Sequence, residues 1–143
     1  IPILFPAMDK VVRADKGPAR ITALTTLGLL ATVPENQIPM ATSTDPNLLS
    51  MLVEVVKEDK GEAREKALWT LQSLARAAEN KVLMATAPEL NLLFLLVEVV
   101  REDKGEARVK ALGVLWNLAG SDDNKVPLAT STDLAYCLYW WRW

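Results

Sequence analysis

The apolar residues of this chain recur with a helical period. In residues 62–77, the apolar residues Ala63, Ala67, Leu71 and Leu74 follow steps of four, four and three. Such steps place all four side chains on one face, which predicts a long helix with that face packed. The opposite side, which we expect at the surface, carries Glu65, Trp69, Gln72, Ser73 and Arg76.

Two other kinds of helix accompany this long helix. Residues 48–56 and 92–100 are apolar nearly all round, and a helix of that kind is buried between neighbours. Residues 80–86 and 124–130 predict a shorter helix that starts at an asparagine. Because an asparagine side chain can accept a hydrogen bond from a first-turn N–H, we interpret this residue as an N-cap. The asparagines at this position are Asn36, Asn80 and Asn124.

The three kinds of helix recur every 44 residues. The motif EDKGEAR occupies residues 58–64 and 102–108, and a looser copy, ADKGPAR, occupies residues 14–20. Residues 55–87 match residues 99–131 at 20 of 33 positions. Self-similarity at a fixed period of this length is typical of a helical repeat array.

Each repeat places a loop before its long helix. The loop ends at glycine, and Pro18, Glu62 and Glu106 then open the helix. Proline needs no N–H there, and glutamate complements the positive end of the helix. We therefore expect an all-α chain of about three 44-residue repeats in one array, truncated at both ends. Its expected divisions are a partial repeat at 1–33, repeats at 36–78 and 80–120, and a partial repeat at 124–143.

The order of these segments resembles the armadillo repeat. The resemblance rests on the NK dipeptide at the short helix, the proline after that helix, LLFLLVEVV at residues 92–100 and GEARVKALGVLWNLA at residues 105–119. It covers the whole chain. It implies a right-handed superhelical solenoid whose long helices line a concave groove. Members of the family often hold an extended peptide there, with an asparagine and a tryptophan one turn earlier.

Two residues match this peptide-holding pattern. Asn117 stands at the position of the family's asparagine and Trp69 at that of its tryptophan, whereas Gly113 and Ser73 depart from it. Trp116, beside Asn117, would supply an aromatic surface in another register. For both tryptophans, display in the groove and packing in the core remain open. The candidate groove residues are Trp69, Gln72, Ser73, Arg76, Trp116 and Asn117.

The arginine that ends the repeated motif has two interpretations. Arg20, Arg64 and Arg108 stand at the same position of successive repeats. Each can pair with an acid such as Asp59 or Asp103 on its own or the next repeat. Alternatively, the three form a ladder that grips an acidic or phosphorylated partner.

The C-terminal stretch LAYCLYWWRW predicts a second candidate surface. By register it begins the next buried helix, with aromatic residues where other repeats carry Leu, Val, Met and Phe. Soluble monomers rarely expose a patch of this size. We expect further chain, a capping segment, a partner protein or a membrane interface to cover it. The residues of this patch are Tyr136, Tyr139, Trp140, Trp141 and Trp143.

Composition narrows the possible functions. The 143 residues include 16 basic and 18 acidic ones, and this formal charge of -2 does not favour nucleic acid. Histidine is absent and Cys137 is the single cysteine. Disulfides, zinc sites of Cys and His, and histidine-activated nucleophiles are thereby excluded. No apolar run reaches the ~20 residues of a membrane span, and an unpaired cysteine suits the cytoplasm or another reducing compartment.

The sequence therefore predicts a protein that is not an enzyme and that uses no cofactor or metal. We expect a non-catalytic protein–protein interaction scaffold or adaptor, which binds a partner segment on the concave face of its long helices. The alternative is a structural subunit of a larger complex, held through its apolar, aromatic terminal helices.

Overall fold

The computed structural model describes residues 2–130 and 132, and the regular structure in this part of the chain is α-helical. The predicted all-α class is thus confirmed. The helices are α1 (Leu4–Ala14), α2 (Pro18–Ala31), α3 (Pro34–Ala41), α4 (Leu48–Glu58), α5 (Glu62–Leu74), α6 (Ala78–Thr86), α7 (Leu92–Glu102), α8 (Glu106–Ala119) and α9 (Asp122–Thr130).

The long helices α2, α5 and α8 begin at the predicted residues. Each follows a glycine, and Pro18, Glu62 and Glu106 are their first residues. The aspartate of the DKG loop fixes this entry, because its carboxylate accepts the N–H of the glycine two residues later. The nitrogen–oxygen distance is 2.7 Å from Gly17 to Asp15 and 3.1 Å from Gly61 to Asp59.

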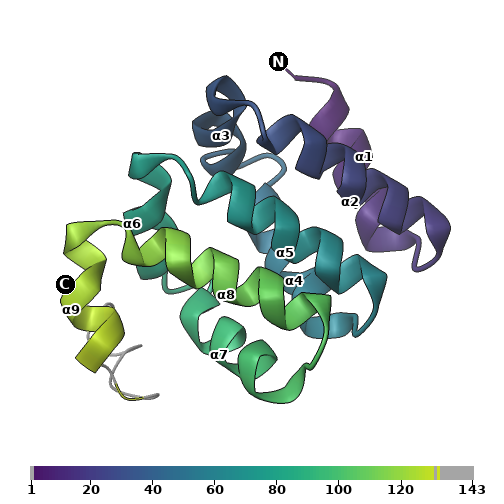
Figure 1. Cartoon of the computed structure of the whole chain (residues 1–143). Helices are drawn as coiled ribbons and strands as arrows, with labels where there is room; N and C mark the ends of the chain where they lie inside the picture. Colours follow the sequence, from purple (N-terminus) through teal and green to yellow (C-terminus); the bar gives the residue numbers. More distant parts are fainter. Residues whose placement is uncertain (1, 131, 133–143) are drawn as a thin grey trace.

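The long helices lie side by side, with α5 between α2 and α8 (Figure 1). Each long helix also packs on the apolar helix that precedes it, which we call the middle helix of its repeat. The pairs are α2 on α1, α5 on α4 and α8 on α7. The core fills the space between the long and middle helices, and Leu71 is fully buried there, as the stripe of residues 62–77 predicts. A helix of only three or four turns is marginally stable in isolation, so burial of this face against neighbouring helices is its main source of stability.

The short helices begin earlier than predicted, so the N-cap interpretation of the asparagines is wrong. Helix α6 starts at Ala78, which puts Asn80 inside its first turn. There the side-chain amide of Asn80 donates to the main-chain oxygens of Leu74, at 2.8 Å, and Gln37, at 2.9 Å. The asparagine thus satisfies a carbonyl at the C-terminal end of the preceding long helix, which has no partner within that helix.

The other two asparagines act in the same way. Asn36 donates to the main-chain oxygen of Leu30 at 3.0 Å. Asn124 donates to that of Leu118 at 2.8 Å and to that of Lys81, one repeat earlier, at 3.1 Å. Each asparagine therefore bonds its short helix to the long helix before it. Asn80 and Asn124 also bond it to the short helix of the preceding repeat, which we also call the preceding unit.

The arginines Arg20 and Arg64 join neighbouring units. The Nε of Arg20 donates to the Val12 main-chain oxygen at 2.8 Å, and its Nη atoms lie 3.6 Å from carboxylate oxygens of Glu58 and Asp59. In the next unit, Arg64 likewise lies 3.4 Å from Asp103. These contacts confirm the interpretation that Arg20 and Arg64 pair with acids of the next repeat.

Candidate functional site

A hollow of about 350 Å³ crosses the surface of all three long helices. It takes one residue from α2, three from α5 and two from α8, so it runs across the helix axes and not along one helix. Its lining residues are Thr25, Glu65, Lys66, Trp69, Glu106 and Lys110.

Trp69 is the aromatic residue of the hollow, and it is both packed and displayed. Its ring lies against Gly28 of α2, where a β-carbon would come within 2.3 Å of the ring carbon Cζ3. Its remaining surface lines the hollow, and the Lys66 ammonium lies 5.9 Å from the ring centroid. At that distance an ammonium is attracted weakly by the ring. Trp69 therefore packs against a neighbouring helix with part of its ring and displays the rest in the hollow.

Charged side chains of both signs surround the ring. The carboxylates belong to Glu65 and Glu106, and the ammonium groups to Lys66 and Lys110. None of these four residues was a site candidate from the sequence, although Glu65 was expected on the displayed face of its helix. A signal was present, because Lys66 and Lys110 stand at the same position of successive repeats.

Gln72 and Asn117 are partly engaged within the chain. The Gln72 amide lies over Gly113 of α8, where a β-carbon would come within 2.4 Å of its Nε2 atom. Asn117 donates from its side chain to the Gln72 main-chain oxygen at 2.8 Å. Both residues thus help to join α5 to α8.

Three of the other candidate residues lie apart from the hollow. Ser73 is only 1% exposed, so the expectation that it is displayed is wrong. The helix that carries it, α5, is packed between α2 and α8. Arg76 is exposed just beyond the C-terminal end of α5. Trp116 is 80% exposed and does not line the hollow. Of the six predicted groove residues, only Trp69 lines the hollow.

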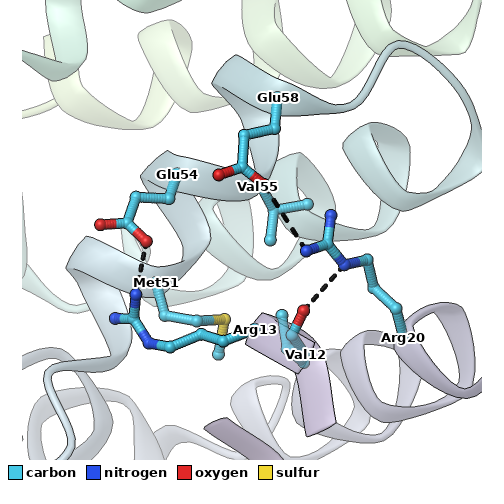
Figure 2. Close-up of a pocket in the computed structure, with 7 residues that line it drawn as sticks. All are labelled: Val12, Arg13, Arg20, Met51, Glu54, Val55 and Glu58. Carbon is cyan, nitrogen blue, oxygen red and sulfur yellow. Dashed lines mark hydrogen bonds and ion pairs between the residues drawn. The ribbon is translucent and has the colours of Figure 1, made fainter. Parts of the chain in front are cut away.

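A second cavity, of about 200 Å³, lies beside α1 and α4 (Figure 2). Its charged residues face one another, since Arg13 pairs with Glu54 and Arg20 with Glu58. Lys16 also pairs with Glu58, at 3.2 Å, and lowers the pKa of that carboxyl below its usual value of 4.5. Because these charges are paired internally, the cavity offers little to a charged ligand.

The remaining predictions concern the chain end, metals and membranes. The aromatic patch of residues 136–143 lies outside the described residues. Among the described residues, no cluster of three or more His, Cys, Asp or Glu side chains is arranged to hold a metal ion. None of the described helices has the length and hydropathy needed to cross a membrane.

Comparisons with protein-family models, with curated proteins and with solved structures find no match for this chain.

Proposed function

We propose that this chain is a non-catalytic protein-interaction module, an armadillo-like right-handed solenoid whose long helices bind an extended segment of a partner protein. The observation that carries the proposal is the hollow across α2, α5 and α8, with the half-buried ring of Trp69 inside it. An exposed aromatic surface in a depression is a typical anchor point at protein interfaces.

The direction of the hollow favours an extended segment over a helix lying along one groove. Its lining residues come from three consecutive long helices, so an occupant must cross them in turn. An apolar side chain of the segment would lie on Trp69. Polar or charged side chains of both signs would meet the glutamates and lysines on either side, and such charges favour specificity over affinity.

The lining residues favour binding over catalysis. Thr25 carries the only hydroxyl among them, and that hydroxyl donates to the Ile21 main-chain oxygen at 2.8 Å. A hydroxyl nucleophile needs a base within hydrogen-bonding reach, whereas this hydroxyl donates to its own helix. The proposed role is therefore that of a scaffold or adaptor.

The proposal is tested by filling the hollow. Peptides selected from a random display library on the intact chain are titrated against two variants of α2, Thr25→Trp and Thr22→Trp. Both threonines donate their hydroxyl to the main-chain oxygen four residues earlier, but only Thr25 lines the hollow. We expect Thr25→Trp to weaken binding at least tenfold and Thr22→Trp to leave it unchanged. Equal effects of the two substitutions would contradict the proposal.

A further inference from the structure

Successive long helices interlock through one large and one small residue. Trp69 of α5 lies over Gly28 of α2, and Gln72 of α5 lies over Gly113 of α8. In both pairs a β-carbon on the glycine would come within 2.4 Å of the opposite side chain. In each pair, the residue on the earlier helix is Gly28 or Gln72, and these two residues share one repeat position with Trp116 of α8.

On α8 this position faces no further helix among the described residues. Leu24 of α2 and Leu68 of α5 are fully buried, whereas Leu112, at the same position of α8, is 47% exposed. Val109, one turn earlier, is 57% exposed, and Trp116, one turn later, is 80% exposed. On α2 and α5, this face packs against the next long helix. The equivalent face of α8 is an exposed apolar stripe.

Three basic residues of the third unit also correspond to residues that bind the next unit. In the first unit, Arg13, Lys16 and Arg20 pair with acids of the next unit. Those acids are Glu54, Glu58 and Asp59. The third unit carries Arg101, Lys104 and Arg108 at the same positions. Within the described part of the chain, none of these three forms an ion pair.

We propose that this end of α7 and α8 is a docking surface for a partner helical unit of the same kind, one middle and one long helix. The surface consists of Val109, Leu112, Trp116, Arg101, Lys104 and Arg108. The partner unit carries a glycine opposite Trp116, because each large residue at these interfaces meets a glycine. It also carries carboxylates opposite the three basic residues.

A second copy of this chain does not meet these requirements. Its residue at the position opposite Trp116 is Thr25, whose β-carbon would occupy the space that glycine leaves open. Its residue opposite Arg101 is Lys10, where the second unit has Glu54. Like charges and excess volume both disfavour head-to-tail stacking of identical chains. The surface therefore selects a different unit.

The test gives the N-terminal unit of this chain the two features that the partner unit needs, so that one copy can bind the α7 and α8 surface of another. In the intact chain, Lys10→Glu with Thr25→Gly creates the missing carboxylate and glycine, and sedimentation velocity measures association against concentration. We expect association at least tenfold tighter than that of the unsubstituted chain. Adding Trp116→Ala is expected to return it to the level of the unsubstituted chain. The matched control is Lys10→Glu with Thr22→Gly, which puts a glycine elsewhere on α2 and is expected to give a much smaller increase, because Thr25 still fills the space opposite Trp116.

Several results would overturn the proposal. The first is that Lys10→Glu with Thr25→Gly leaves association unchanged, and the second is that the increase survives Trp116→Ala. The third is an equal increase in the Thr22→Gly control. The fourth is that the unsubstituted chain already associates through Trp116. Circular dichroism monitors the folding of each variant. If Thr25→Gly unfolds α2, Lys10→Glu alone, which supplies the carboxylate opposite Arg101, replaces the double substitution.

Discussion

The ring of Trp69 lies over Gly28, one repeat earlier, so closely that a β-carbon at position 28 would come within 2.3 Å of it. This contact joins α2 to α5 and fixes one edge of the hollow proposed to bind a partner segment. Glycine is needed at position 28 for space and not for its backbone, since it lies within a regular helix.

Gly28→Ala is therefore expected to destabilise the fold. Overpacking of this kind costs about 1–3 kcal/mol in the free energy of unfolding, measurable by urea denaturation. Gly105→Ala is the matched control, because a β-carbon there meets nothing within 4 Å. In a Trp69→Leu background the cost of Gly28→Ala should fall, and an unchanged cost would contradict the contact.

Leu71→Ala tests the packed stripe of α5. Leu71 is fully buried between the long and middle helices, and a truncation of this kind typically costs ~2–5 kcal/mol of unfolding free energy. Leu29→Ala on α2 is the comparison, since Leu29 is 60% exposed, and its cost should be much smaller. Equal costs for the two substitutions would show that the faces of the long helices are wrongly assigned.

Asn80→Ala tests the link between short helices. It removes the donor to two main-chain oxygens, those of Leu74 and Gln37, in a fully buried position. Leaving such groups without a partner costs about 1–3 kcal/mol. Asn36→Ala removes one hydrogen bond at a half-buried site and should cost less. Thermal unfolding of the two variants would give the order, and the reverse order would contradict the role given to Asn80.

Glu58 predicts a small dependence of stability on pH. Its hydrogen bond with Lys16 lowers the pKa of Glu58 below 4.5 in the folded state. The stabilisation is therefore present above the unfolded pKa and is lost as the pH falls through the folded pKa. Because the carboxylate is half exposed, we expect only about 0.2–1 kcal/mol.

The measurement is the unfolding free energy of the unsubstituted chain and of Glu58→Gln between pH 7 and pH 3. Their difference should shrink as the pH falls. In a Lys16→Gln background, which removes the hydrogen bond to the Glu58 carboxylate, this trend should weaken. A Glu58→Gln difference that stays constant across this range would contradict the pairing.

The sequence predicted the helices better than it predicted their lateral contacts. The starts of α2, α5 and α8 follow from the local chemistry of glycine, proline and glutamate, and they were predicted correctly. The role of Asn80 was missed because α6 begins at Ala78, and helix ends are poorly determined by local sequence. The burial of Ser73 depends on how adjacent long helices are rotated against each other, which a periodicity along one helix does not contain.

The most direct test of the proposed function is an NMR titration of the isotope-labelled chain with display-selected peptides. The hollow predicts that the largest shifts occur at the Trp69 indole N–H and at the amides of Thr25 and Lys110, while the Trp116 indole N–H stays unchanged. Shifts confined to Trp116, or a failure to select any binding peptide, would contradict the proposal that the long-helix surface binds an extended partner segment.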